Sequence, residues 1–285
     1  MTAGRLTALA LAAALGAAGC GHTDGTRHRA AEVVVGSRAG IESTLLADIY
    51  TGALRSYGFP AHTEQAPDPL TKLDAGAFVV VPGFTGRVLQ TFQPGAAVRS
   101  DAQVYKAMIG ALPEGIAAGD YTTAAEDKPA LAVAESTSKS WGGGDLSALA
   151  RHCDGLVVGS IAGTSTPPAV GSCRLPAAHE FPDDATLFAA AKAGEVTAAW
   201  TTTADPNVPA DLVVLTDGKP ALVQAENVVP LYRRNELTDR QLLAVNEVAG
   251  VLDTAALVDM RRQVTAGADP QAVADAWLNE HPLGR

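Results

Sequence analysis

Aromatic residues, basic charge and long apolar runs are all scarce in this chain of 285 residues. Phe, Trp and Tyr make up 5% of it, and 21 Lys and Arg face 31 Asp and Glu, for a formal net charge of −10. An acidic chain without a Lys/Arg stripe gains nothing from counterion release along a phosphate backbone, so we exclude nucleic acid as a partner. The same charge excludes a polybasic contact with a membrane surface.

The sequence also lacks the local motifs of common enzymes. It contains no phosphate-binding P-loop, no GxSxG elbow, no HExxH pair and no GxGxxG after a strand. Its six histidines are scattered without the spacing of metal ligands. We therefore predict a protein that is not an enzyme and holds no metal or cofactor. With 47% apolar residues, the chain can bury a core as a globular protein does.

Only residues 6–18 resemble a membrane element, and they are shorter than the roughly 20 apolar residues that span a bilayer. Arg5 precedes this run, and Ala-Ala-Gly-Cys ends it at Cys20. The pattern resembles a bacterial lipoprotein signal, which predicts a signal peptide at 1–19, lipidation of Cys20 and a polar tether at 20–30. Cleavage would remove Arg5 alone among charged residues, giving −10 − 1 = −11. An ordinary cleaved signal that happens to end near a cysteine remains the alternative.

The other two cysteines, Cys153 and Cys173, form an even pair in a chain predicted to be exported. We expect a disulfide between them, which would stabilise the fold by roughly 3 kcal/mol in the chain-entropy model. A metal site or catalytic thiol is the alternative, although neither a CxxC spacing nor a neighbouring His/Cys cluster supports it.

Apolar patterning predicts strands alternating with helices from about residue 31 onward. Short apolar or β-branched runs favour buried strands, and apolar residues at helical spacing favour amphipathic helices. The predicted strands are 32–36, 78–82, 130–134, 156–159, 196–200 and 212–215, and the predicted helices are 45–57, 85–92, 101–112, 145–151 and 184–193. This alternation predicts an α/β protein with mainly parallel sheets covered on both faces.

The last part of the chain has a different pattern, with three consecutive helices predicted at 238–252, 254–264 and 270–280. Thr238 and Asp269 precede two of them as plausible caps, and Pro270 suits a first helical position.

Several separated motifs carry a resemblance to one family. Residues 35–42 are similar to its Val-Gly-Ser-Lys-x-Phe-Thr-Glu, residues 81–86 to its Pro-Glu-Tyr-Thr-Gly, residues 199–205 to its Tyr-Thr-Thr-Asp, and residues 212–217 to its Leu-Leu-Asp-Asp. Residues 227–233 and the helical tail ending at 274–278 fit as well. The chain resembles, over roughly residues 33–283, the substrate-binding lipoproteins of glycine betaine, choline, carnitine and proline (osmoprotectant) ABC importers.

The resemblance implies a two-lobed, type II periplasmic-binding-protein fold with two crossover hinge strands and a helical C-terminal tail packed on the first lobe. The expected lobes are residues 31–128 with 231–285, and residues 129–230. The implied partners are a small-molecule ligand in the cleft and an ABC permease in the membrane. The protein would be a monomer anchored by its lipid to the extracytoplasmic face of the cell membrane.

The candidate ligand-binding residues follow from these motifs and from the chemistry of an osmolyte. A methylated cation binds against aromatic faces, and a carboxylate needs convergent donors or a helix N-terminus. Because ligands of open α/β sheets bind at the carboxyl ends of strands, Ser37 and Arg38 are suited to a carboxylate. The full candidate set is Ser37, Arg38, Phe84, Thr85, Trp141, Trp200, Thr201 and Tyr232.

Each candidate has a structural alternative. Arg38 would otherwise be a solvated charge, Glu42 a support for its own helix, and Thr85 and Thr201 hydroxyls that satisfy local backbone. Trp200 and Thr201 are neighbours in a strand, so only one should face the cleft squarely. Trp141 is either an aromatic at the edge of the cleft or a loop residue without contact to the ligand. Tyr232 has the same two alternatives, ligand contact or a structural role.

Three departures from the family motifs affect the expected ligand. Phe84 replaces the family's tyrosine, Gly83 replaces its acidic neighbour, and Gly40 with Ile41 replaces its Phe-Thr pair. Together with the few aromatics, they leave open a larger or less cationic solute. They also leave open a rival function, a surface lipoprotein acting as a sensor or protein-binding scaffold.

Overall fold

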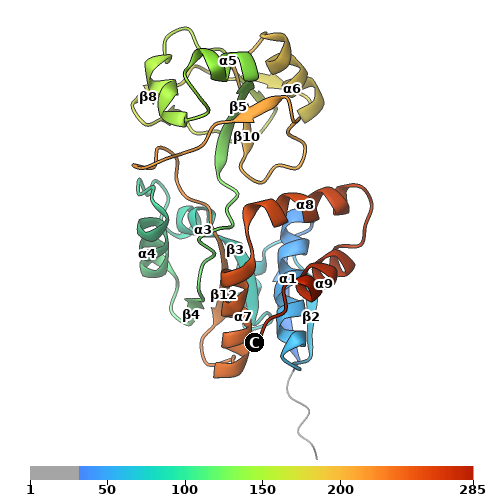
Figure 1. The fold of residues 1–285 in the computed structure, drawn as a ribbon. Coiled ribbons are helices and arrows are strands. Elements are labelled where there is room, and N and C mark those ends of the chain that lie inside the picture. Colours follow the sequence, from blue (N-terminus) through green and yellow to red (C-terminus); the bar gives the residue numbers. More distant parts are fainter. Residues whose placement is uncertain (1–31, 285) are drawn as a thin grey trace, which may run out of the picture. The chain divides into compact units, whose positions relative to one another are not determined.

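The computed structural model describes residues 32–284, whose strands form two five-stranded sheets and a two-stranded ribbon (Figure 1). We call the first sheet with its helices lobe 1 and the second sheet with its helices lobe 2. The predicted signal peptide, tether and lipidation site at Cys20 lie outside the described residues.

Lobe 1 is built on a sheet with strand order β2-β1-β3-β12-β4. The run of valines predicted as the first strand forms β1, which lies between β2 and β3 and runs parallel to both. The strands are β1 (Val33–Ser37), β2 (Ala61–Gln65), β3 (Val80–Phe84), β4 (Ile116–Ala118) and β12 (Val228–Arg233).

Helices cover both faces of this sheet, and their apolar sides pack into two hydrophobic clusters. α1 (Ile41–Ser56) begins after Gly40, whose φ of 125° suits a residue without a side chain, and it packs into one hydrophobic cluster with the C-terminal helices. A second cluster on the other face includes Leu73, Leu89 and Met108. These come from α2 (Pro69–Asp74), α3 (Thr85–Phe92) and α4 (Asp101–Ala111).

Lobe 2 has a sheet of strand order β11-β5-β10-β6-β9. The strands are β5 (Pro129–Ala134), β6 (Val158–Ile161), β9 (His179–Phe181), β10 (Ala198–Thr202) and β11 (Leu212–Val214). Its helices are α5 (Glu135–Ser140), α6 (Asp184–Ala193) and a 3-10 helix, η1 (Leu146–Arg151), where we predicted a helix at 145–151.

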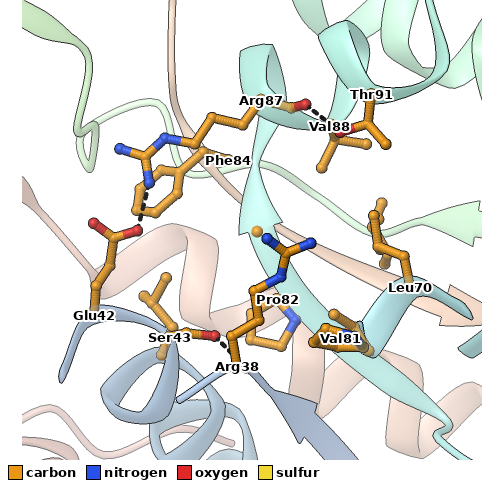
Figure 2. Close-up of a pocket in the computed structure, with 14 residues that line it drawn as sticks. Arg38, Glu42, Ser43, Leu70, Val81, Pro82, Phe84, Arg87, Val88 and Thr91 are labelled. Carbon is orange, nitrogen blue, oxygen red and sulfur yellow. Dashed lines mark hydrogen bonds and ion pairs between the residues drawn. The ribbon is translucent and has the colours of Figure 1, made fainter. Parts of the chain in front are cut away.

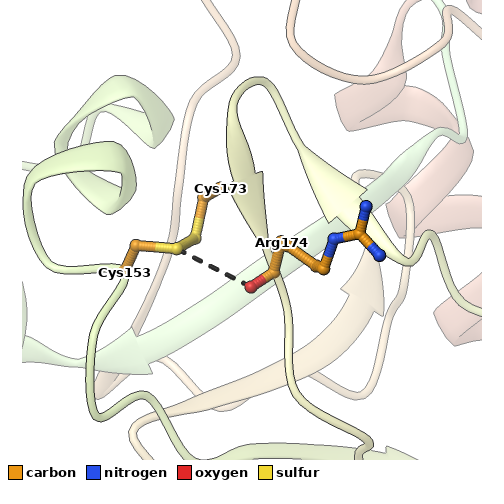
Figure 3. Close-up of a disulfide and its surroundings, with 3 residues drawn as sticks. All are labelled: Cys153, Cys173 and Arg174. Atoms are coloured by element: carbon orange, nitrogen blue, oxygen red, sulfur yellow. Dashed lines mark hydrogen bonds between the residues drawn. A yellow bond between two sulfur atoms is a disulfide. The ribbon is translucent and has the colours of Figure 1, made fainter.

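A disulfide joins Cys153 to Cys173 in lobe 2, which confirms the predicted pair (Figure 3). Cys173 lies in the ribbon formed by β7 (Ala169–Val170) and β8 (Cys173–Arg174), and Cys153 follows η1. The Cα atoms are 5.6 Å apart across a sequence separation of 20. The bond therefore ties the ribbon to the part of the lobe that follows η1.

Two passages of chain connect the sheets, one ahead of β5 and one ahead of β12, and they pair with each other at Glu126 and Asn227. Our prediction of mainly parallel sheets is wrong at these passages. β5 runs antiparallel to β10 and β11, and β12 antiparallel to β3 and β4. A strand that arrives from the other sheet enters at the carboxyl edge, and it therefore runs against its parallel neighbours. Residues 228–230, predicted in the second lobe, pair with β3 of the first sheet.

The predicted helical tail is confirmed as α7 (Asp239–Val251), α8 (Thr254–Thr265) and α9 (Pro270–Glu280). Thr238 and Gln241 form a capping box at the start of α7, and the Asp269 side chain accepts from the backbone N–H of Ala272 at the start of α9. Ala274, Trp277 and Leu278 of α9 belong to the same core cluster as α1. The tail thus completes the core of lobe 1.

Candidate functional site

A cavity of about 190 Å³ lies at the carboxyl ends of β1 and β3, the edge at which open α/β sheets bind ligands (Figure 2). Aliphatic side chains, including Leu70, Val81 and Val88, form much of its wall. The charged residues that line it are Arg38, Glu42 and Arg87. The cavity thus combines an apolar wall with three charges at its rim.

The aromatic ring of this cavity, Phe84, carries a cation from its own chain. The Arg87 guanidinium carbon lies 4.4 Å from the centroid of the Phe84 ring, within the range of a cation–π contact. Figure 2 shows the guanidinium beside the ring and directed toward Glu42. Phe84 is only 3% exposed, so this ring is already covered.

Arg87 belongs to a charge network drawn from four separate segments. Its guanidinium pairs with Glu42 of α1 and lies 2.9 Å from the Asp127 carboxylate in the first passage. Arg261 of α8 pairs with the same two carboxylates, at 2.9 Å and 3.3 Å. Each arginine therefore bridges the same two acids.

The network also reaches the loop that follows β10 of lobe 2. Arg261 donates to the Ala204 carbonyl at 2.8 Å, and the Ala204 N–H donates to Asp127 at 3.2 Å. The Asp127 and Arg261 side chains are 2% and 7% exposed. A buried charge without a partner destabilises the folded state, so these bonds are needed to stabilise the passage between the sheets.

Burial and pairing act in opposite directions on the two acids. For Asp127, burial opposes ionisation, but Arg261, hydrogen bonds and Arg87 outweigh it, and the pKa falls below its usual value. For Glu42, burial dominates over the attraction of Arg87, and the pKa rises. Asp127 is thus the firmly ionised centre of the network.

Glu226, in the second passage, occupies the N-terminus of α3. Its carboxylate accepts the backbone N–H of Arg87 at 2.8 Å, and a Cβ at Gly86 would stand 2.7 Å from the same carboxylate. Only glycine at position 86 allows this approach. Burial raises the Glu226 pKa to about 7, although the backbone N–H groups of Arg87 and Gly86 and the charge of Arg87 lower it.

Ser37 and Arg38 lie at the carboxyl end of β1, as predicted. Among the described residues the Arg38 guanidinium forms no hydrogen bond or ion pair, while its backbone N–H donates to Ser43. The Ser37 hydroxyl is buried and has no hydrogen-bond partner within residues 32–284. Unlike Arg87, Arg38 forms no ion pair with any of these residues at the wall of the cavity, and Asp68 is the acid that lies close enough to interact with its charge.

Thr85 has its hydroxyl committed to the second passage. It accepts the Asn227 N–H at 3.1 Å and donates to the Ala225 carbonyl at 3.4 Å, and the residue is fully buried. This is the local role that we set against ligand contact.

Trp200 and Thr201 both line a second cavity, of about 210 Å³, at the carboxyl edge of the lobe 2 sheet. Trp200 is 7% exposed and packs into the lobe 2 core, and Thr201 donates to the Asp205 carboxylate at 2.7 Å. The structure thus brings the two neighbours to one cavity, although their side chains leave the strand on opposite faces.

Trp141 and Tyr232 do not join either cavity. Trp141 is 8% exposed, packs in the lobe 2 core and stacks on His152, so it is a core residue rather than a cleft-edge aromatic. Tyr232 pairs with Val80 at the start of β3, whereas Val228 pairs with Phe84 at its end. Four residues of strand, roughly 13 Å, therefore separate Tyr232 from the carboxyl edge.

The charged residues of the network escaped sequence reasoning, except for Glu42, which we took as a helix support. The burial of Arg261 could have been predicted from the sequence, because it lies on the same side of α8 as the apolar residues Leu257, Met260 and Val264. Asp127 and Glu226 lie in irregular passages without any pattern.

Within residues 32–284 no group of three or more His, Cys, Asp or Glu side chains is placed to hold a metal ion. No single described helix is long and apolar enough to cross a membrane, and one bent pair, α7 with α8, could do so by length and composition only.

The two-sheet architecture, with a cavity at the carboxyl edge of each sheet, defines a two-lobed solute-binding protein of the type II periplasmic class. Residues 31–280 match the family described as the substrate-binding domain of ABC-type glycine betaine transport systems, and the chain belongs to this family. Members are solute-binding proteins of ABC transporters and not enzymes; they work with permeases on the extracytoplasmic side.

Solved structures share the fold. Apo YehZ from Escherichia coli is 20% identical, with a TM-score of 0.70 over 89% of this chain and 99% of that one. A glycine betaine/carnitine/choline ABC transporter protein is 15% identical, with a TM-score of 0.73 over 87% and 98%. A choline-binding protein in complex with choline is 18% identical, with a TM-score of 0.54 over 88% and 89%. No curated protein matches this chain.

Proposed function

We propose that this protein is a lipid-anchored solute-binding protein that delivers a small osmolyte, of the glycine betaine, choline, carnitine or proline type, to an ABC importer. One observation carries the proposal: the cavity at the carboxyl edge of lobe 1 contains an unpaired guanidinium, that of Arg38. A free cation at the wall of a small apolar cavity attracts a carboxylate. Among these solutes, the ones that carry a carboxylate are therefore favoured.

The proposed contacts come from both lobes. Arg38 would hold the carboxylate, whereas Ser37 is buried and does not line this cavity, so it would stay behind the site. Phe84 would form part of the wall on lobe 1, and Thr201 would contact the solute from lobe 2, with Trp200 packed behind it in the lobe 2 core. Thr85 would act indirectly, by joining α3 to the second passage.

Thermal melting of the purified protein with betaine, choline, carnitine, proline and a wider solute panel tests this function. A solute at 100 times its dissociation constant adds about 2.7 kcal/mol to the free energy of unfolding, and calorimetry then gives its affinity. Arg38→Gln should lower the affinity for a solute with a carboxylate by about tenfold or more, because the variant loses a charged hydrogen bond. Its matched control is Arg99→Gln, in a different cavity.

A flat response across the whole panel would reject solute binding and favour the sensor or protein-binding scaffold. The anchor has a separate test. Full-length protein should fractionate with membranes, and Cys20→Ser should release it if the lipid on that thiol is the only anchor. Light scattering checks the proposed monomer.

A further inference from the structure

The Phe84 ring, the one aromatic side chain that lines the lobe 1 cavity, is not available to a ligand cation. We propose that Arg87 is a built-in cation of this site, because it occupies the ring face that a ligand cation would need. The protein then recognises the carboxylate and the apolar body of the solute, and a positive charge on the solute adds nothing to the affinity. This inference rests on the proposed solute-binding function and narrows its ligand class.

The first argument is that Arg87 is held in place over the ring. Besides the stacking on Phe84, its guanidinium pairs with Glu42 and donates to both the carboxylate and the backbone carbonyl of Asp127. A ligand ammonium group that displaced it would have to break all of these bonds. It would also leave Asp127, whose side chain is 2% exposed, with Arg261 as its one charged partner among the described residues.

The second argument concerns the place of the carboxylate. One helix N-terminus at this edge, that of α3, is already occupied, because its Arg87 N–H donates to the carboxylate of Glu226. Arg87 and Arg261 are each shared between two acids. Arg38 is therefore the guanidinium at this cavity that remains unpaired among the described residues.

The third argument is the lining of the cavity near Arg38. Leu70, Val81 and Pro82 line the same cavity as Arg38 (Figure 2). The volume of about 190 Å³ equals roughly six water molecules of the liquid. An apolar wall next to one free cation suits a small carboxylate with a compact hydrocarbon body, which gains from burial of its apolar surface.

A pair of isosteres provides the experiment. Glycine betaine and 3,3-dimethylbutyrate have the same shape and the same carboxylate, but a quaternary nitrogen in the first is a carbon atom in the second. Calorimetry on the purified full-length protein should show that 3,3-dimethylbutyrate binds at least as tightly as glycine betaine. A ligand cation stacked on an open aromatic face would instead favour betaine, by about 2-fold to about 30-fold. Betaine tighter by about threefold or more overturns the inference.

Arg87→Gln provides the second readout, because it uncovers the Phe84 face. The ratio of the two affinities should shift toward betaine by about 2-fold to about 30-fold, whereas Arg262→Gln, an exposed arginine on α8, should leave the ratio unchanged. An unchanged ratio in folded Arg87→Gln protein overturns the inference. If that variant does not fold, the ratio in the natural protein decides alone.

The outcomes separate this inference from the proposed function. Preference for betaine or choline overturns the inference and leaves solute binding in place. Binding of only uncharged solutes does the same. Absence of binding by every solute in the panel rejects the proposed function and this inference with it.

Discussion

Replacing Arg261 with Met is expected to remove a large part of the stability of this protein. Arg261 is 7% exposed at its side chain and serves three groups, the carboxylates of Glu42 and Asp127 and the carbonyl of Ala204. Methionine has a similar length but no donor, so Asp127 keeps its charge in a buried place with one arginine fewer. Breaking a buried ion pair in this way costs about 3–5 kcal/mol. Urea denaturation followed by tryptophan fluorescence measures the loss as a lower midpoint.

The neighbouring residue is a matched control for this experiment. Arg262 is on the same helix, is 60% exposed and pairs with Asp259 at 3.8 Å, so Arg262→Met should cost about 0.5 kcal/mol or less. Asp127→Asn in the Arg261→Met background should recover part of the loss, because it removes the stranded charge. An Arg261→Met protein within about 1 kcal/mol of the natural one would refute our account of the network.

Three further perturbations have defined outcomes. Because burial raises the Glu226 pKa from 4.5 to about 7, the native state binds more protons than the unfolded state between these values, so this group lowers stability as pH rises from about 4.5 to about 7. Glu226→Gln should therefore gain up to about 3 kcal/mol relative to the natural protein between pH 5 and pH 8 in urea titrations, and equal pH dependence of the two proteins would contradict this. The double variant Cys153→Ser with Cys173→Ser should lose roughly 3 kcal/mol, and an unchanged urea midpoint would show that the bond adds nothing. Thr238→Ala removes the capping box of α7 and should cost about 1 kcal/mol, which a melting curve unchanged from the natural one would disprove.

The sequence predicted those elements whose signals are local. The helices at 85–92 and 184–193 were predicted with the bounds that the structure has, since apolar spacing and, for α6, an aspartate cap determine them. β2 was missed because its Ala-His-Thr-Glu-Gln sequence is polar, as suits an edge strand, and β4 because its Ile-Ala-Ala sequence has a single β-branched residue. The direction of β5 and β12 depends on where the chain crosses between sheets, which no local pattern reports.

The candidate site was predicted less well than the fold, for a similar reason. Motif positions located Arg38, Phe84 and Trp200 at strand ends, and the structure places all three beside cavities. The pairing of Arg87 with Asp127 is a tertiary contact over 40 residues of sequence. Trp141 was misjudged because the glycines after it suggested a loop, whereas its ring is buried against His152.

The placement of the last helices has a consequence for how the chain folds as it is synthesised. Every strand of the lobe 2 sheet lies between residues 129 and 214, so that lobe can assemble while the chain is still growing. Lobe 1 is completed later, because β12 lies between β3 and β4 in its sheet and Ala274, Trp277 and Leu278 fill its core against α1. A chain released early by even a dozen residues would therefore carry a finished second lobe and an open first one. Its exposed apolar surface would make such a fragment a substrate for chaperones and proteases.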